Sequence, residues 1–259
     1  MDGRSAGREG ATKVAQATTG PHRVLQRHRR RPTGNDRSAR PARNRDETGS
    51  VRAGFVVALT VLTATACAPP GSGSSPYRYT VPVTSGVTVG YGGVGSHHDY
   101  PAADIVASPG CRTPLVSPVD GRVLEVRTVD LYDPATDNPA YRGGRYVSIL
   151  GADGVRYYLA HLDTVAPGLA AGQQVGAGAV VGTMGRTGRA GACHVHLGIS
   201  PPCPGKEWSV RRGVVWPQPY LDAWRRGGTA SPAAEVDAWT RANPDACAAA
   251  ARDPYAPGA

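Results

Sequence analysis

From residue 77 to about residue 200, glycine-rich turns separate short runs of alternating apolar and polar residues. Residues 121–129 (GRVLEVRTV) alternate, and the apolar runs 145–150 and 155–162 flank the turn sequence GADG, which is a good hairpin signal. This pattern is typical of short strands joined by tight turns. We therefore expect an all-β fold over residues 81–205, an antiparallel sandwich or barrel.

The C-terminal residues 206–259 have a different character. The sequence PQPYLDAW can form a short helix, and the pairs Ser231-Pro232 and Asn243-Pro244 each suit a helix cap followed by the first helical residue. Val236 and Trp239 follow the first pair at helical spacing. We expect two short helices from this extension, packed on the edge of the sheet.

The segment before the strands predicts export. Residues 1–50 are rich in Arg, Gly, Ser, Thr and Pro without a sustained apolar period, which indicates a disordered leader. Residues 53–66 are almost wholly apolar or small, a stretch too short to cross a bilayer comfortably but suited to the apolar region of a signal peptide. The alternatives are a buried helix or an internal anchor, and a translation start near residue 51 would place the signal peptide at the chain start.

Small residues directly precede Cys67, as in the lipobox of bacterial lipoproteins, although Ala64 stands where a Leu is usual. The resemblance implies a signal peptide at residues 51–67 and a lipid on Cys67 that holds the protein to the membrane. The Pro/Gly/Ser-rich residues 68–80 then form a flexible tether. We expect an exported protein at the outer face of the cell membrane or in the cell envelope.

The net charge of +9 is uneven along the chain. Residues 1–66 hold 13 basic and 5 acidic residues and therefore +8 of this charge, so the remainder is nearly neutral. A basic tail can bind anionic polymers nonspecifically. Because the expected folded part carries almost no net charge, we expect no nucleic-acid partner. We also expect a monomer.

Five cysteines agree with an oxidising compartment. If Cys67 carries a lipid, four remain for two disulfides. Cys193 and Cys203 flank a Gly/Pro turn and are the expected pair, which leaves Cys111 with Cys247. Thiolate metal binding is disfavoured, because the sequence contains no C-x-x-C spacing.

Histidines supply the candidate chemistry. In the sequence CHVHLGIS, residues 193–200, strand alternation places His194 and His196 on one face and the apolar side chains on the other. His161 ends the preceding apolar run. Each histidine taken alone also suits a surface or strand-end residue.

A second group lies in the sequence SHHDYPAADI, residues 96–105. Here His97 or His98, together with Asp104, falls on a turn that leads into an apolar strand. A catalytic zinc takes three protein ligands plus water, and His and carboxylate are normal ligands. One His and Asp104 from this turn, with one His from the later strand, make such a set.

With these residues in place, the chain resembles the lysostaphin/LytM family of zinc peptidoglycan endopeptidases over about residues 85–200. That family shows a first His and Asp, then a strand-end His followed by Leu, then H-x-H. The resemblance implies a lysostaphin-like fold, one zinc ion and a peptidoglycan peptide substrate, either glycine-rich or containing D-amino acids. In the family the first His usually falls where Tyr100 stands here, so a longer loop must bring His98, the favoured choice, or His97 to the metal.

Carried over to this sequence, the resemblance implies that His98, Asp104 and His196 hold zinc and that His161 and His194 are catalytic. We expect His194 as the general base and His161 as the donor to the oxyanion. The expected function is zinc-dependent hydrolysis of peptide bonds in bacterial peptidoglycan.

Two other classes remain. A zinc-bearing domain that cleaves nothing and regulates other wall hydrolases is one, and Tyr100 favours it. A lipoyl-type carrier domain is the other, but it needs a lysine in a hairpin, and Lys206 lies in a Pro/Gly loop after the last expected strand.

Overall fold

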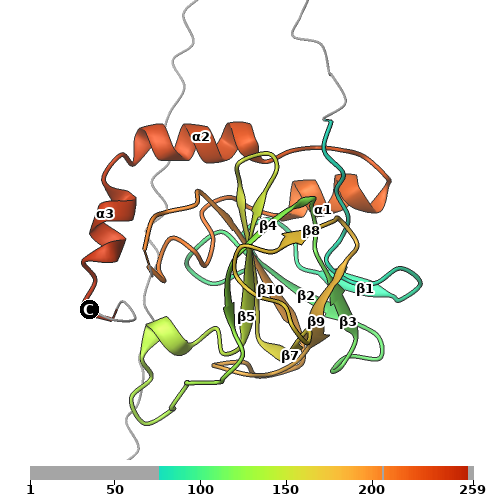
Figure 1. Cartoon of the computed structure of the whole chain (residues 1–259), viewed down its shortest axis with the longest axis horizontal. Coiled ribbons are helices and arrows are strands. Elements are labelled where there is room, and N and C mark those ends of the chain that lie inside the picture. The colour runs from blue at the N-terminus through green and yellow to red at the C-terminus, as the bar shows by residue number, and fades with distance from the viewer. Residues whose placement is uncertain (1–75, 206, 256–259) are drawn as a thin grey trace, which may run out of the picture. The chain divides into compact units, whose positions relative to one another are not determined.

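The computed structural model describes residues 76–205 and 207–255 (Figure 1). The expected leader, signal peptide, Cys67 and most of the tether lie outside the described residues. The elements, in chain order, are β1 (Val89–Tyr91), β2 (Ala103–Ala107), β3 (Pro114–Val116), β4 (Gly121–Arg127), the 3-10 helix η1 (Pro139–Tyr141), β5 (Tyr146–Gly151), β6 (Arg156–Ala160), β7 (Leu162–Val165), β8 (Gln174–Val175), β9 (Val180–Met184), β10 (Val195–Ser200), α1 (Gln218–Arg225), α2 (Ala233–Ala242) and α3 (Ala246–Ala251).

Two antiparallel sheets form the body of the described part. The larger has the strand order β1-β2-β10-β6-β5-β4-β8, and the smaller has the order β3-β9-β7. Strands β5 and β6 form the hairpin predicted around GADG. The expected all-β antiparallel fold is therefore confirmed.

The core lies where side chains from both sheets meet. On β10, Val195, Leu197 and Ile199 are fully buried, and they pack with side chains of the smaller sheet such as Met184. Burying an aliphatic side chain of this size is worth about 1.5–3 kcal/mol. Because side chains alternate along a strand, this burial forces His196, Gly198 and Ser200 onto the opposite face of β10.

The segment that contains Arg212 crosses this second face of β10 at Gly198. A Cβ at residue 198 would clash with the carbonyl oxygen of Arg212, so only glycine permits this approach. The segment therefore covers the middle of β10. It leaves His196 on one side of the crossing and Ser200 on the other.

The described part of the C-terminal extension forms three helices rather than the expected two, because each of the three stretches with helical signals is a helix (Figure 1). Leu221 and Trp224 of α1 and Val236 of α2 join the main core, and Trp224 stacks on Tyr79 with 5.3 Å between ring centroids. The hydroxyl of Ser231 accepts a hydrogen bond from the backbone N–H of Ala233, at the start of α2. None of the helices in the described part is both long and apolar enough to cross a membrane.

The disulfide pairing differs from the expected one. Cys111 pairs with Cys193, and Cys203 pairs with Cys247, with Cα–Cα separations of 5.2 Å in both cases. The pairing of Cys193 with Cys203 was wrong because β10 lies between them. Six extended residues span about 20 Å, and a disulfide requires Cα atoms within about 7 Å.

Candidate metal centre and its cleft

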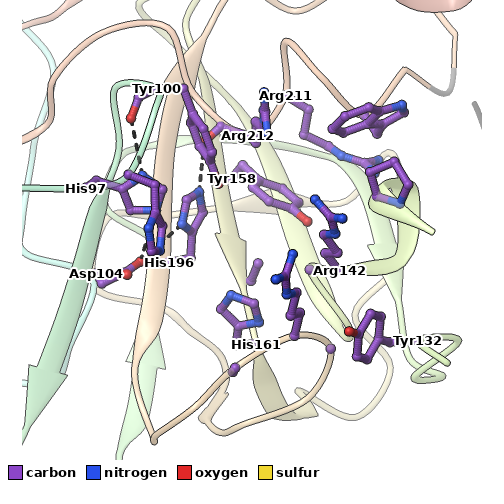
Figure 2. Close-up of a pocket in the computed structure, with 18 of the residues that line it drawn as sticks. His97, Tyr100, Asp104, Tyr132, Arg142, Tyr158, His161, His196, Arg211 and Arg212 are labelled. Carbon is purple, nitrogen blue, oxygen red and sulfur yellow. Dashed lines mark hydrogen bonds and ion pairs between the residues drawn. The ribbon is translucent and has the colours of Figure 1, made fainter. Parts of the chain in front are cut away.

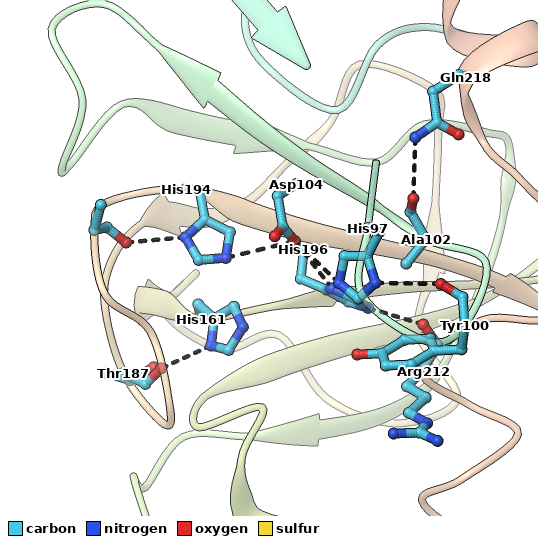
Figure 3. A network of polar contacts seen from close by, with 11 residues as sticks. His97, Tyr100, Ala102, Asp104, His161, Thr187, His194, His196, Arg212 and Gln218 are labelled. Carbon is cyan, nitrogen blue, oxygen red and sulfur yellow. Dashed lines mark hydrogen bonds and ion pairs between the residues drawn. The ribbon is translucent and has the colours of Figure 1, made fainter. Parts of the chain in front are cut away.

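Three neighbouring strands bring the candidate residues together. Asp104 on β2 lies directly opposite His196 on β10, and His196 lies opposite Ala160 on the other side. His161 directly follows Ala160, at the end of β6. Adjacent strands lie about 4.8 Å apart, so the register places Asp104 and His196 side by side, with the strand end that carries His161 next to them (Figure 3).

His97 reaches this row from the loop before β2. Its Nε2 lies 3.6 Å from Oδ1 of Asp104, and Nδ1 of His196 lies 3.2 Å from the same oxygen. One ligand atom from each of the three residues lies within 4.8 Å of the others. Ligand atoms of a tetrahedral zinc site lie about 3.3–3.4 Å apart when the bonds are 2.0–2.1 Å, so the donor set and its spacing fit one zinc ion.

His98, the favoured first ligand in the sequence analysis, lies outside this group. It is exposed, and its ring meets the His97 ring edge-on with centroids 4.9 Å apart. His97 is buried instead, because its Nδ1 donates to the carbonyl oxygen of Tyr100 at 3.2 Å and its ring packs on the Tyr100 ring at 4.5 Å. The structure therefore groups His97, the alternative that the sequence left open, with Asp104 and His196.

Backbone carbonyls orient all four imidazoles of the cluster (Figure 3). The pairs are Nδ1 of His97 with the oxygen of Tyr100, Nδ1 of His161 with that of Thr187 at 2.8 Å, Nδ1 of His194 with that of Ala192 at 2.9 Å, and Nε2 of His196 with that of Arg212 at 2.8 Å. A carbonyl oxygen only accepts hydrogen bonds, so the nitrogen that faces it carries the proton. In the neutral imidazole the other nitrogen then presents a lone pair.

His196 shows what this arrangement requires. A neutral imidazole has one N–H, which Nε2 donates to the carbonyl of Arg212. Its Nδ1 lone pair then faces the carboxylate oxygen of Asp104 at 3.2 Å. Two lone pairs at that distance repel unless a proton or a cation lies between them, so this contact favours a bound cation.

Burial and mutual proximity set the protonation states of the cluster. Burial, reinforced by His196, lowers the pKa of His97 to about 4, and burial with His196 and His194 lowers the pKa of His161 to about 3. Burial alone would raise the pKa of Asp104, but the close contact with His196 and the other nearby imidazoles outweigh it and hold that pKa below its usual range. At neutral pH, His97 and His161 are therefore neutral and Asp104 is ionised.

His161 occupies a strained turn between the two sheets. Its φ is 64°, in the left-handed region that non-glycine residues rarely adopt, and its N–H donates to the carbonyl of Gly143 at 2.9 Å. The turn brings its ring to within 4.7 Å of the His194 ring, between centroids. Nε2 of His194 lies 3.6 Å from Oδ1 of Asp104, so both imidazoles flank the candidate metal centre.

A cleft of about 830 Å³ opens above the cluster. Figure 2 shows His97, Asp104 and His196 together at one side of it, with Arg142 and Tyr132 at the other. The loop that carries Arg142 is tied to the β9–β10 loop, because the N–H of Arg189 donates to the Arg142 carbonyl at 2.7 Å. The disulfide of Cys193 anchors the end of that second loop, next to His194.

Comparison with known protein families gives one match. Residues 99–207 match the model of peptidase family M23. This range holds Asp104, His161, His194 and His196, whereas His97 lies two residues before it. The predicted resemblance to the lysostaphin/LytM-type peptidases is confirmed over these residues.

Several solved structures are similar to this chain. The catalytic domain of the antimicrobial peptidase lysostaphin from Staphylococcus simulans is 22% identical, with 52% of this chain and 92% of that chain covered and a TM-score of 0.39. A putative glycyl-glycine endopeptidase LytM from Ruminococcus gnavus is 24% identical, with 58% and 61% covered and a TM-score of 0.43. A zinc-containing peptidase from Vibrio cholerae is 22% identical, with 53% and 38% covered and a TM-score of 0.37.

This chain thus spans less than two thirds of the latter two proteins. Comparison with curated protein sequences gives no match. The site also contains residues that the sequence analysis missed. The cleft wall formed by Trp208, Arg211 and Arg212 follows the last strand and has no motif to mark it, and the orienting carbonyls leave no signal in a sequence.

Proposed function

We propose that this chain, of which residues 99–207 match peptidase family M23, hydrolyses peptide bonds of bacterial peptidoglycan with one zinc ion held by His97, Asp104 and His196. The observation that carries the proposal is the convergence of three ligand atoms within 4.8 Å, flanked by two further imidazoles. Zinc supplies Lewis acidity there, since it polarises a carbonyl and lowers the pKa of an attacking water to about 7.

His194 suits the role of general base. Its Nδ1–H is committed to the carbonyl of Ala192, so Nε2 is free to accept a proton on the side that faces Asp104. The protonated ring can then return that proton to the leaving amine. Its position beside the candidate metal centre lets both transfers occur without a large movement.

His161 suits a different role from the expected oxyanion donor. Its Nδ1–H is committed to the carbonyl of Thr187, so the neutral ring has no N–H left for the oxyanion. Its low pKa keeps the ring neutral at neutral pH. We therefore assign His161 to accept a hydrogen bond from the attacking water and to orient it.

The alternative, a zinc-bearing domain that regulates other wall hydrolases, loses its support. Tyr100 favoured that alternative because it stands where the family has its first His. The structure brings His97 into the cluster and packs it against Tyr100, so the candidate ligand set is complete.

Zinc content and cleavage test the proposal together. The full chain should hold about one zinc per molecule and should release free amines from purified sacculi, and a chelator should stop the release. His97→Ala should lose both the zinc and the activity. The matched variant His98→Ala removes an exposed imidazole from the same loop and should retain both.

Two outcomes would contradict parts of the proposal. A zinc-loaded chain that releases no amines would favour the regulatory domain. Loss of zinc in His98→Ala and its retention in His97→Ala would restore the sequence-based choice of first ligand.

Export and a lipid on Cys67 are part of the same proposal. Two disulfides within the described residues support an oxidising compartment. Mass spectrometry of the N-terminal peptide from the membrane fraction should show a lipid-modified cysteine at position 67. An unmodified Cys67 peptide would contradict the anchor.

A further inference from the structure

One wall of the cleft carries a cation that is held by aromatic rings rather than by a carboxylate. Arg212 lines the cleft, and no carboxylate among the described residues forms an ion pair with it. Its Nε is buried without a hydrogen-bond partner in the same part of the chain, as is Nε1 of the neighbouring Trp208. Both atoms can only donate hydrogen bonds, so this wall lacks acceptors.

Two aromatic rings hold the guanidinium in place. Its central carbon lies 3.9 Å from the centroid of the Tyr100 ring and 5.1 Å from that of Trp208. Such cation–π contacts fix the orientation of the group and leave its charge uncompensated. Figure 2 shows Arg212 beside the Tyr100 ring, facing the cleft.

The other arginines of the cleft are paired. Arg211 donates to Glu125 at 3.0 Å and to Tyr146 at 2.8 Å. On the opposite wall Arg142 and Arg189 share the single carboxylate of Asp137, at 2.7 and 3.3 Å. Four arginines line the cleft, together with the carboxylates of Asp99 and Asp104, and Arg212 is the one of the four that forms no ion pair within the described part of the chain.

We propose that Arg212 determines substrate specificity by binding a free carboxylate of the peptide that is cut. This inference rests on the proposed function, and it selects between the two substrate classes that the family resemblance implies. Stem peptides with D-amino acids carry free carboxylates, whereas the interior of a glycine chain carries none. The cleft therefore suits substrates that carry a free carboxylate.

The position of Arg212 limits where that carboxylate lies. The Tyr100 ring separates the guanidinium from His196, with 6.0 Å between the centroids of the Tyr100 and His196 rings. The guanidinium is therefore within about 10 Å of the His196 ring. An extended peptide advances about 3.3 Å per residue, so the carboxylate belongs within about three residues of the scissile bond.

Matched substrates test the inference on the full chain. Cross-linked stem-peptide dimers with free carboxylates should be cut with kcat/KM about 10- to 100-fold above the same dimers with carboxylates converted to amides, since a charge-assisted hydrogen bond is worth about 1.5–3 kcal/mol. The difference should lie mainly in KM. In Arg212→Gln the ratio of kcat/KM for the acid dimer to that for the amide dimer should fall to about one. In Arg212→Lys part of the wild-type ratio should remain.

Arg226→Ala is the matched control, because it removes an exposed cation at the end of α1 that does not line the cleft. It should keep the full preference. Zinc content should be the same in all variants, which shows that the Arg212 substitutions leave the metal centre intact. Equal cleavage of acid and amide dimers by the wild type, or an unchanged preference in Arg212→Gln, would overturn the inference and leave the proposed function standing.

If the wild type cuts neither dimer, the proposed function fails, and binding decides the inference separately. Calorimetry with the same two dimers should then show tighter binding of the acid form by the wild type and equal binding by Arg212→Gln. Equal binding of both dimers by the wild type would refute the role of Arg212.

Discussion

Two polar clusters lie on the same face of β10, on either side of the crossing at Gly198. In one cluster the charges pair with each other, whereas the other has nitrogen lone pairs in excess. Around Ser200, Arg156 pairs with Glu207 and donates to the Ser200 hydroxyl at 2.9 Å. Glu207 also accepts hydrogen bonds from two backbone N–H groups, at 2.9 and 3.1 Å. Every charge of this cluster has a partner of opposite sign within the protein.

Around His196, imidazoles outnumber carboxylates. Four imidazoles surround the one carboxylate of Asp104, and each is held by a backbone carbonyl on the side away from the cluster. Their remaining nitrogens have no proton to share in the neutral state. A polar cluster that satisfies itself supports the fold, whereas one with surplus lone pairs is prepared for a ligand.

The largest expected effect comes from His196→Ala. Removing a proposed ligand should eliminate zinc binding and reduce kcat/KM by about 10⁴-fold, because Lewis-acid activation is worth several kcal/mol. The unfolding free energy measured with chelator present should fall by only about 1–2 kcal/mol, from the lost hydrogen bond to Arg212. Retained zinc would show that the two clusters do not differ as described.

Glu207→Ala should lower the stability strongly and leave zinc binding unchanged. It leaves Arg156 buried without a counter-charge, so the unfolding free energy should fall by about 3–5 kcal/mol in denaturant titration. Zinc content of the folded fraction should stay near one per molecule. Asp237→Ala, an exposed acidic residue on α2, should change stability by less than about 0.5 kcal/mol. A loss of zinc from folded Glu207→Ala would mean that the clusters are coupled.

His161→Ala separates ligands from reacting groups within the His196 cluster. Zinc should remain bound, while kcat falls by about 10²-fold or more because the attacking water is no longer oriented. Single-turnover kinetics with zinc analysis checks both quantities. Full activity in this variant would remove His161 from the mechanism.

Ser200→Ala should have the smallest effect. It deletes one hydrogen bond from a charged group, so stability should fall by about 1.5–3 kcal/mol with no change in kcat/KM. Thermal unfolding and the peptide assay measure the two. A change in activity larger than the change in the folded fraction would contradict the separation of the clusters across Gly198.

The sequence predicted local features well. Alternation located β4 and the β5–β6 hairpin, and it placed His196 on the polar face of β10, with His194 directly before that strand. It did not predict that His97 rather than His98 would be buried beside Asp104, because the hydrogen bond between His97 and the Tyr100 carbonyl depends on the fold of the loop. The disulfide pairing was mispredicted because strand β10 separates Cys193 from Cys203. The Gly/Pro turn signal between them did not indicate a strand of that length.

The cross-strand pairing of His196 with Asp104 has a consequence for folding. Shifting β10 by one residue against β2 would direct His196 into the core and Leu197 outward, and the three proposed ligands would no longer meet. Metal uptake during refolding would therefore count the molecules in which these strands have reached their native alignment. A colorimetric zinc indicator would then follow a step of assembly that circular dichroism, which senses strand content in any alignment, does not resolve.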